Sequence, residues 1–454
     1  MLHPNICQKA RLSRDPRFDG RFFTAVKTTG IYCRTICPVP PPKEENVQYF
    51  ETAIECAQAG FRPCLRCRPD SAPGSPAWQG INTTLSRAIK LINEGALQGS
   101  SLRTLAQRLG ISDSYLRQLF SKNLGVSPKT YALYQQCLFA KQLLHQTSLP
   151  INQVALASGF GSVRRFNDCF KAQLKLTPSS MRKTPASISH LKLKLSYRPP
   201  FDWYAMQRTL SQRAINQMEW CDKNSYGRTF HWHGSQGTFT AHHLADKNLF
   251  NVSINIDDIK QLQSVTNNIK RILDLDVDMQ VVEHDLNKSK LLNFPISNGL
   301  RLPGIWSMFE AGIRAILGQQ VSIAAARGLV ENLVCSLGQT TNCGKLLFPT
   351  PQEILKSDLN FLKIPNTRKQ TLRNLAQHYL NSDEPNDAKQ WFALKGIGPW
   401  TIAYAQMRGL SHPDIFLADD LGIKKALADS AKTFDASQAS PWQSYLTFQL
   451  WKQL

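Results

Sequence analysis

Four cysteines near the start of the chain constrain its fold more than any other feature. Three residues separate Cys33 from Cys37, and two separate Cys64 from Cys67. Two close pairs across one intervening stretch are the spacing of a tetrahedral thiolate site for zinc. The part of the chain that contains them, about residues 1–75, is too short to build a large apolar core. We therefore expect Zn²⁺ on the four sulfurs to provide what the core lacks.

Positive charge is concentrated in the first part of the chain. The whole sequence carries a formal net charge of +21 at pH 7. Residues 1–190 contain 25 Lys and Arg against 10 Asp and Glu, and the remaining residues contain 29 against 23. An excess concentrated in this way favours a polyanionic partner, and double-stranded DNA is the partner we expect. The alternative is that the charge serves solubility alone.

We expect neither a cleaved export signal nor a membrane-spanning segment in this sequence. The first residues lack the apolar core of a signal peptide, and no stretch approaches 18 consecutive apolar residues. Eleven cysteines, an odd number, suit a reducing compartment and one metal site better than a disulfide framework. We expect a cytoplasmic, nucleoid-associated protein with no membrane partner.

The middle block, between linker-like residues 71–80 and 184–190, has the spacing of two helix-turn-helix units. Leu102, Leu105 and Leu109 follow the i, i+3, i+7 pattern of an amphipathic helix, and Ser112 can cap the next helix. The pattern recurs at Val154, Ala155, Ala157, Gly159, Phe160 and Ser162, then at Phe166, Phe170 and Leu174. Helix, turn and helix is the arrangement of many DNA-reading domains.

A more specific pattern lies in the second unit. Gly159-Phe160-Gly161-Ser162, Phe166, Phe170-Lys171 and Thr177-Pro178 resemble the AraC-type transcription-regulator domain, over residues 80–183. The resemblance implies two recognition helices in successive major grooves. The candidate DNA-binding residues are Arg117, Arg164 and Arg165, with Asp113, Ser114, Tyr115, Gln118, Ser162, Val163 and Asn167 beside them. We assign Phe166 and Phe170 to the core. The alternative is a helical bundle with a solvated basic face.

The cysteine quartet can also act as a reagent. Zinc keeps thiolates deprotonated at neutral pH, and a thiolate can accept an alkyl group by displacement. Four thiolates on Zn²⁺ carry a formal charge of −2, which alkylation of one sulfur reduces to −1. Repulsion between the site and DNA phosphates then falls, so an alkylated site would bind DNA more tightly. This is a mechanism for a chemical sensor.

The residues around the cysteines resemble a known acceptor domain. Thr29-Gly30-Ile31-Tyr32-Cys33-Arg34, Glu45-Asn46-Val47 and the run from Ala59 to Cys67 are similar to the N-terminal domain of the Ada adaptive-response family, over about residues 3–72. The resemblance implies zinc on all four cysteines and methyl transfer from a backbone methylphosphotriester to Cys33. Arg34 and Arg66, beside the cysteines, are candidate DNA-binding residues. The alternative is a purely structural zinc site.

Two features depart from the Ada pattern. The stretch Pro38-Val39-Pro40-Pro41-Pro42 lies near the acceptor and could alter how DNA approaches. No Pro-Cys-His-Arg stretch occurs, so repair of O6-alkylguanine is not expected.

The last block contains a glycine hairpin between two apolar helical segments. Gly396 and Gly398 lie in Leu394-Lys395-Gly396-Ile397-Gly398-Pro399-Trp400-Thr401, where backbone N–H groups can approach a phosphate. Asp420 follows Trp400 by twenty residues. This combination resembles the helix-hairpin-helix DNA glycosylases. The AlkA-type alkylbase glycosylases are indicated by Pro199–Trp203, Arg301–Gly304, Phe309-Glu310 and Arg314–Ser322.

The AlkA resemblance implies roles for particular residues. Asp420 is the catalytic carboxylate that stabilises an oxocarbenium-like sugar, and Asp419 caps the following helix. The rings of Trp400, Tyr404 and Trp451 would hold a flipped cationic base. Two further assignments are Gln319 at the pocket edge and Gln320 at the DNA-contacting position where some relatives insert a leucine. Trp400 stands where bifunctional members carry a Schiff-base lysine, so strand cleavage is not expected.

The fold class we expect is multidomain and mainly α with small α+β parts. It comprises a small zinc-bound α/β domain, a two-unit helix-turn-helix bundle, a mixed α/β subdomain and a helix-hairpin-helix glycosylase domain. Their predicted bounds are 1–75, 80–183, 191–295 and 296–454. The function we expect is excision of alkylated purines of the 3-methyladenine type, combined with a zinc-thiolate sensor and a reader of promoter DNA, with RNA polymerase as a further partner. Two alternatives remain: an alkylation-responsive regulator with an inactive glycosylase-like domain, and a glycosylase that uses the first two blocks only for DNA affinity.

Overall fold

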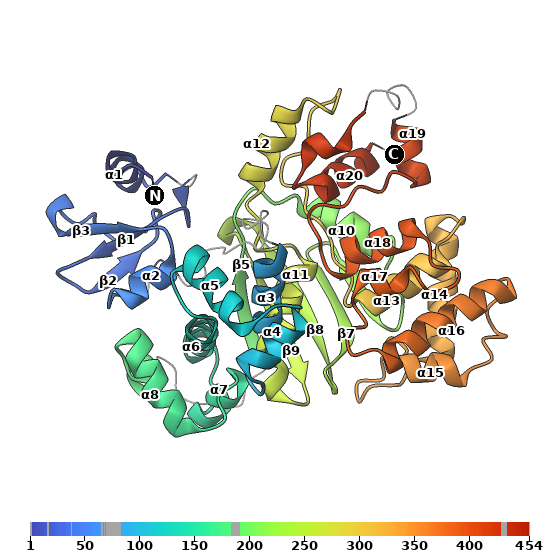
Figure 1. Ribbon diagram of the computed structural model, residues 1–454, viewed down its shortest axis with the longest axis horizontal. Coiled ribbons are helices and arrows are strands. Elements are labelled where there is room, and N and C mark those ends of the chain that lie inside the picture. The colour runs from blue at the N-terminus through green and yellow to red at the C-terminus, as the bar shows by residue number, and fades with distance from the viewer. Residues whose placement is uncertain are drawn as a thin grey trace. The chain divides into compact units, whose positions relative to one another are not determined.

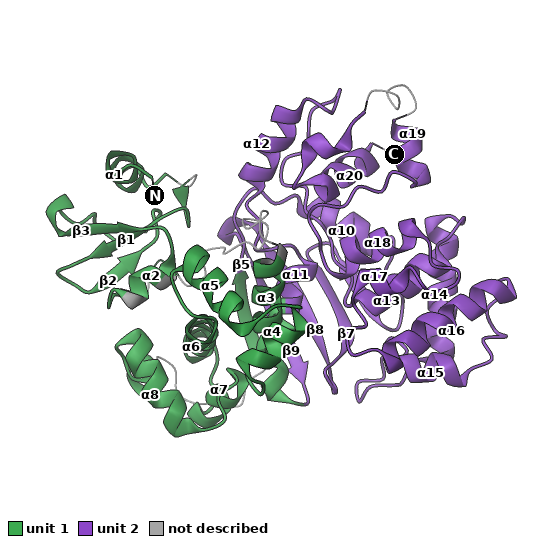
Figure 2. Ribbon diagram, in the orientation of Figure 1, with its two compact units in different colours: residues 1–195, 258–267 green, residues 196–257, 268–454 purple. Residues whose placement is uncertain are grey.

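The computed structural model describes residues 2–15, 18–37, 39–64, 67, 69, 83–182, 191–427 and 434–453. The chain divides into two compact units, shown in different colours in Figure 2. Unit 1 contains residues 1–195 and 258–267, and unit 2 contains residues 196–257 and 268–454. The two predicted linkers, 71–80 and 184–190, lie outside the described residues.

The cysteine-bearing part of unit 1 is a small sheet with two helices (Figure 1). The strand order is β3-β1-β2-β4, with β2 antiparallel to β1 and parallel to β4. The elements are α1 (Pro4–Leu12), β1 (Phe23–Val26), β2 (Ile31–Cys33), β3 (Val47–Phe50), α2 (Ala53–Gln58) and β4 (Arg62–Pro63). Among the described residues, the core cluster under the sheet has Phe23, Ala25, Tyr32, Cys56 and Phe61 as buried members, and a second small cluster holds Cys7, Ala10 and Phe22. Cores this small are what the sequence predicts for a part that a bound metal would stabilise.

The middle of unit 1 is helical and confirms the two predicted helix-turn-helix units. They are built from α3 (Thr83–Asn93), α4 (Leu102–Arg108), α5 (Asp113–Leu124), α6 (Pro128–Gln146), α7 (Ile151–Ala157), α8 (Val163–Leu174) and α9 (Pro178–Met181). Ser112 caps α5 by accepting from the Tyr115 N–H at 3.1 Å, and Ser162 caps α8 in the same way. Gly110 adopts φ +69°, which glycine tolerates best, and turns the chain between α4 and α5.

Two hydrogen bonds of the Tyr134 hydroxyl join these two parts of unit 1. The hydroxyls of Tyr32, on β2, and Tyr134, on α6, are bonded to each other, and both side chains are buried. The Tyr134 hydroxyl donates in turn to the carbonyl of Ala53 at 3.2 Å. The strand that ends in Cys33 is thereby connected to the long helix between the two helix-turn-helix units.

Unit 2 combines an antiparallel sheet with a helical region (Figure 1). Strands β6 to β9 pair in sequence order, and the predicted alternation buries Phe250, Val252 and Ile254. Its strands are β6 (Glu219–Asp222), β7 (Ser225–Trp232), β8 (Ser235–Leu244) and β9 (Leu249–Ile256). The division assigns β5 (Leu191–Ser196), except its last residue, to unit 1, and it divides α11 (Leu262–Ile272) after Asn267. The first helices wholly in unit 2 are α10 (Trp203–Ser211), α12 (Met279–Ser289), α13 (Met308–Leu317) and α14 (Ile323–Leu337). The later helices are α15 (Pro351–Lys356), α16 (Asn366–Asn381), α17 (Ala388–Trp391), α18 (Pro399–Gly409), α19 (Leu421–Ala426) and α20 (Gln443–Lys452).

A buried ion pair fixes α13 against the sheet of unit 2. The guanidinium of Arg228, on β7, donates to both carboxylate oxygens of Glu310, on α13, at 3.1 and 2.8 Å. Arg314, one turn further along α13, donates to Glu310 and to Glu219 on β6. Removing one member of such a buried network typically costs about 3–5 kcal/mol. The network therefore holds α13 in place, and α13 packs against α16 and α18.

Among the described residues, no helix is both long enough and apolar enough to cross a membrane.

Candidate functional site

The four predicted cysteine ligands come together. The Sγ atoms of Cys33, Cys37, Cys64 and Cys67 all lie within 4.8 Å of one another. Cys64 and Cys67 are buried, whereas Cys33 is only half-buried. Strands β2 and β4 position two of the four, because β2 ends at Cys33 and Cys64 follows β4 directly. Four sulfurs at this separation suit tetrahedral coordination of Zn²⁺.

Four thiols this close cannot ionise independently. Hydrogen bonding with Cys37 raises the pKa of the Cys33 thiol, whereas hydrogen bonding with Cys33 lowers the pKa of Cys64, and that of Cys37 to about 7. The sulfurs thus share their protons when no cation is bound. A dication would favour the thiolate at all four positions, so metal binding releases protons.

Arg34, a predicted DNA-binding residue, is anchored inside the domain. Its guanidinium forms an ion pair with the buried carboxylate of Asp19, with Nε donating at 2.8 Å, and Nη1 reaches the Cys67 carbonyl. The Arg34 backbone N–H donates to Cys67 Sγ at 3.3 Å. Sequence reasoning missed Asp19, because it lies in a stretch rich in charged residues, from Arg11 to Arg21, where no local pattern distinguishes it. DNA binding by Arg34 stays a prediction, and Arg66 lies outside the described residues.

The predicted DNA-reading arginines of the helix-turn-helix part are on its surface. Arg164 and Arg165 are exposed in the first turn of α8, and Arg117 is exposed on α5, where it pairs with Asp113 at 3.2 Å. Phe166 and Phe170 are fully buried, as predicted. The exposed positions leave these arginines accessible to phosphates and bases, and the contacts themselves remain predictions.

In unit 2, the carboxylate of Asp420 binds both predicted tryptophans. Trp451 Nε1 donates to Oδ1 at 2.9 Å, and Trp400 Nε1 lies 3.3 Å from Oδ2. Oδ1 also accepts from the backbone N–H groups of Gly422 and Ile423, at 2.9 and 3.2 Å. The structure therefore brings together residues from α18, α20 and the start of α19, as the sequence predicts.

The helix cap is Asp420, and the prediction that Asp419 forms it was wrong. Asp419 is exposed and pairs with Lys424 at 2.9 Å. The helix begins one residue later than expected. The Asp420 carboxylate therefore accepts from the N–H groups in the first turn of α19 that have no partner within the helix. Capping and contact with the indoles are thus combined in one side chain.

The predicted aromatic residues have their rings partly open. Trp400 and Tyr404 stack with centroids 5.3 Å apart at an angle of 25°, and Trp451 meets Phe448 edge-on. All three predicted rings are half-buried. Arg408, buried beneath them, lies 5.7 Å from the Tyr404 ring centroid, and burial lowers the pKa of its guanidinium to about 10.

The hairpin glycines and the two glutamines occupy distinct positions. Gly396 adopts φ +92°, and a Cβ there would lie 2.0 Å from Thr371 Oγ1, so only glycine fits. Gly398 precedes α18 with open space where its Cβ would be. Gln319 donates to Thr401 Oγ1 at 3.1 Å, which ties it to α18 rather than leaving its amide free, whereas Gln320 is exposed with φ +57°. The first helix of the hairpin, α17, is a single short turn.

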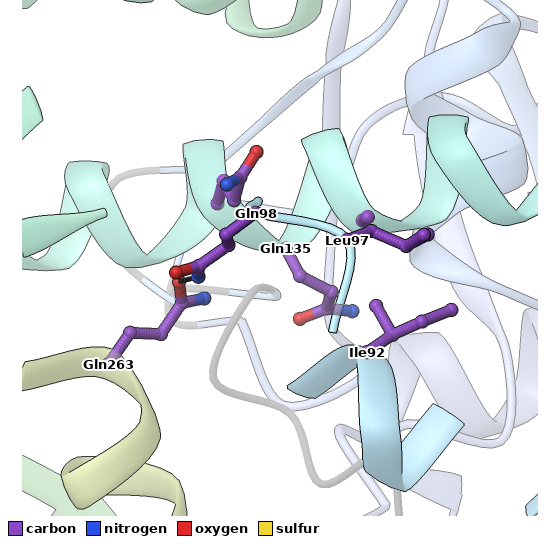
Figure 3. Close-up of a pocket in the computed structure, with 7 residues that line it drawn as sticks. Ile92, Leu97, Gln98, Gln135 and Gln263 are labelled. Atoms are coloured by element: carbon purple, nitrogen blue, oxygen red, sulfur yellow. Dashed lines mark hydrogen bonds between the residues drawn. The ribbon is translucent and has the colours of Figure 1, made fainter. Parts of the chain in front are cut away.

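A small cavity lies in unit 1, between residues that the sequence analysis did not select (Figure 3). Its volume is about 10 Å³, the room of about one water, and Gln98 Nε2 donates to Gln263 Oε1 beside it at 3.1 Å. It is too small to hold a nucleobase.

Comparison with known proteins identifies each part of the chain. A model of the metal binding domain of Ada matches residues 6–70, a helix-turn-helix domain model matches 105–184, and an AlkA N-terminal domain model matches 192–307. A "Probable bifunctional transcriptional activator/DNA repair enzyme AlkA" from Mycobacterium tuberculosis is 33% identical over 477 residues, covering 99% of this chain and 96% of the relative.

The chain belongs to this family of bifunctional AlkA proteins.

Shorter relatives match separate parts of this AlkA-family chain. DNA-3-methyladenine glycosylase 2 of Escherichia coli is 30% identical over 57% of this chain and 95% of the relative. The bifunctional transcriptional activator/DNA repair enzyme Ada of the same organism is 37% identical over 29% of this chain and 35% of the relative. The predicted family resemblances, the four-cysteine zinc site and DNA as the class of partner are confirmed.

Loss of one buried ligand is expected to remove the metal. Cys64→Ser should lower bound zinc well below one equivalent per chain, since a hydroxyl replaces a thiolate at a closed tetrahedral site. Metal analysis by mass spectrometry, together with thermal unfolding, measures this. Cys343→Ser, which changes an exposed cysteine outside the cluster, is the control and should keep the full zinc content. Equal zinc content in both variants would contradict a four-sulfur site.

Proposed function

We propose that this protein excises alkylated purines of the 3-methyladenine type from double-stranded DNA and accepts a methyl group from DNA methylphosphotriesters on Cys33. The observation that carries the excision proposal is the Asp420 carboxylate, held by the indole N–H groups of Trp400 and Trp451. Similarity to DNA-3-methyladenine glycosylase 2 of Escherichia coli supports it.

The proposed excision depends on charge complementarity at two points. An N-alkylated purine is cationic, and the stacked, half-buried rings of Trp400 and Tyr404 offer electron-rich faces to it. As the base leaves, positive charge develops on the deoxyribose, and Asp420 offsets that charge. At an effective dielectric constant of 20, opposite charges 4 Å apart attract by about 4 kcal/mol. The four N–H groups around Asp420 hold its carboxylate in one orientation.

We propose that base removal is not followed by strand cleavage. Trp400 stands at the hairpin position where glycosylases that also cleave the DNA strand carry a lysine. Its indole N–H faces Asp420. Its side chain has no amine to form a Schiff base with the sugar. The product would therefore be an intact abasic strand.

The proposed methyl transfer uses Cys33, one of the two half-buried cysteines of the cluster. Bound zinc would hold Cys33 as a thiolate, and the sulfur attacks the methyl carbon while the phosphotriester oxygen leaves as a phosphodiester anion. Cys33 is half-buried at the end of β2, whereas Cys64 and Cys67 are buried. The neutral Arg34–Asp19 pair leaves the sulfur cluster as the main negative charge there, so methylation would weaken repulsion of DNA phosphates.

The helix-turn-helix part would recognise promoter DNA. The exposed Arg117, Arg164 and Arg165 would contact promoter DNA, with RNA polymerase as a further partner and alkylation as the signal. We retain domain bounds of 1–75, 80–183, 191–295 and 296–454. Excision would then take place in the last of these domains, which contains Asp420. The protein would act in the cytoplasm at the nucleoid.

Asp420→Asn is expected to abolish most base release. The amide can still cap α19, but it carries no charge, so the release of 3-methyladenine from alkylated DNA should slow at least about 100-fold. Asp419→Asn removes the same charge from the exposed neighbour and should retain excision near the wild-type rate. Chromatography of the free base measures both. Equal rates in the two variants would contradict the assignment of Asp420.

Trp451→Phe is expected to slow excision while retaining an aromatic ring. Loss of one N–H bond to a carboxylate costs about 1.5–3 kcal/mol, so single-turnover excision should slow about 10- to 100-fold, with little change in DNA affinity. Trp442→Phe is the matched control, because Trp442 Nε1 also donates to a carboxylate, that of Asp285, at 2.8 Å. An unchanged rate for Trp451→Phe would show that the N–H bond does not position Asp420.

Methyl transfer is tested on the same protein. Incubation with DNA that carries one methylphosphotriester should add one methyl group to the wild-type chain, located on Cys33 by peptide mass spectrometry. Cys33→Ala should acquire none. Methyl transfer without base release would favour the alternative of a regulator with an inactive glycosylase-like domain, and base release without methyl transfer would favour a glycosylase with accessory DNA-binding parts.

A further inference from the structure

The cavity beside Cys33 is much larger than a methyl group. Its volume is about 390 Å³, whereas room for one water, which is similar in size to a methyl group, is roughly 10–15 Å³ in the same measure. The sulfur-bearing residues Cys33, Cys37 and Cys64 form part of its wall. Apolar side chains form much of the remainder: Val26, Ile31, Val39, Pro40, Pro41 and Pro42. A single transferred carbon would leave most of this space unfilled.

The proline wall of the cavity is held in place. Arg11, on α1, is buried and donates from Nη1 to the carbonyl of Pro42 at 3.0 Å. The same guanidinium donates to Tyr49 at 3.2 Å and forms an ion pair with Glu44. Since proline also fixes its own φ, this wall cannot easily close onto the sulfur. The space is therefore preformed.

The strand opposite Cys33 keeps the floor of the cavity open. Thr24, on β1, pairs directly with Cys33 in the antiparallel register and lines the cavity. Residues directly opposite each other project to the same face of a sheet, with Cβ atoms about 4.5–5.5 Å apart. A small residue here leaves room beside the sulfur that a larger one would fill.

We propose that Cys33 accepts alkyl groups larger than methyl, of two to four carbons, from DNA phosphotriesters, with the chain beyond the transferred carbon lying in this cavity. The proposal rests on the proposed function of Cys33 as an acceptor and widens its substrate class. The bond between sulfur and the first alkyl carbon forms as the bond between that carbon and the phosphotriester oxygen breaks. The electron pair stays on the oxygen, which becomes the phosphodiester anion, and Cys33 becomes a thioether.

Burial of the longer chain should be visible in relative rates. Each buried CH₂ is worth about fourfold, so two extra carbons should favour propyl transfer about 15-fold. The experiment compares two duplexes with one methyl or one n-propyl phosphotriester at the same phosphate, and measures alkylation of the zinc-loaded chain by intact mass. Reaction of each duplex with 2-mercaptoethanol corrects for the lower intrinsic reactivity of propyl carbon. The corrected propyl-to-methyl ratio is the quantity that the proposal predicts.

Two variants narrow the cavity from different sides. Thr24→Leu and Val39→Phe should each lower the corrected ratio toward 1, whereas Thr24→Val, which keeps the size of the side chain, should leave the ratio near 15. Val39→Phe changes a loop residue, so it tests the cavity even if Thr24→Leu does not fold. As a readout independent of rate, the methyl NMR signals of Val26 and Ile31 should shift more in the S-propyl protein than in the S-methyl protein.

The outcomes separate this proposal from the one on which it rests. A corrected ratio near 15 that falls in the narrowed variants supports the larger substrate class. Methyl transfer with a corrected ratio of 1 or less overturns it and leaves methyl acceptance intact. Absence of either group from Cys33 overturns the acceptor function itself.

Discussion

The first seventy residues depend on four sulfur atoms that lie within 4.8 Å of one another. The sheet that bears them has strands of two to four residues, and its core contains few buried side chains. Hydrophobic burial on that scale cannot offset the entropy of ordering the chain. Coordination of one ion closes the loop between the two cysteine pairs. In the proposed methyl transfer the same ion would also make the sulfurs reactive, so stability and chemistry would have a common origin in this part of the protein.

In unit 2 the corresponding constraint is the carboxylate of Asp420. It accepts two backbone N–H groups of α19 and two indole N–H groups from α18 and α20. Because its position is fixed by three helices, the carboxylate would need no rearrangement during the proposed excision, when charge develops on the sugar. The buried Arg228–Glu310 pair fixes α13, against which α18 packs, so the sheet contributes indirectly to the same arrangement.

Much of this arrangement could be predicted from the sequence, and the failures have two causes. Cysteine spacing, the cap at Ser112 and the distance from Trp400 to Asp420 are local or motif-based signals, and the structure places those residues as expected. The Arg34–Asp19 pair and the buried Arg228 network join residues far apart in the chain, with no periodicity to indicate them. Choosing between Asp419 and Asp420 as the cap required knowledge of where the chain turns, which adjacent identical residues do not reveal.

The phenol pair of Tyr32 and Tyr134 has a mechanical consequence. Since the Tyr134 hydroxyl gives its one proton to the Ala53 carbonyl, its oxygen must receive the proton of Tyr32. Separation of the two parts of unit 1 would break these hydrogen bonds. Each hydroxyl or carbonyl that stayed buried without a partner would cost about 1–3 kcal/mol of free energy. Tyr32, the residue before Cys33, is thus hydrogen-bonded to α6, the helix of 19 residues in the helix-turn-helix part. A displacement of β2 would therefore also displace α6.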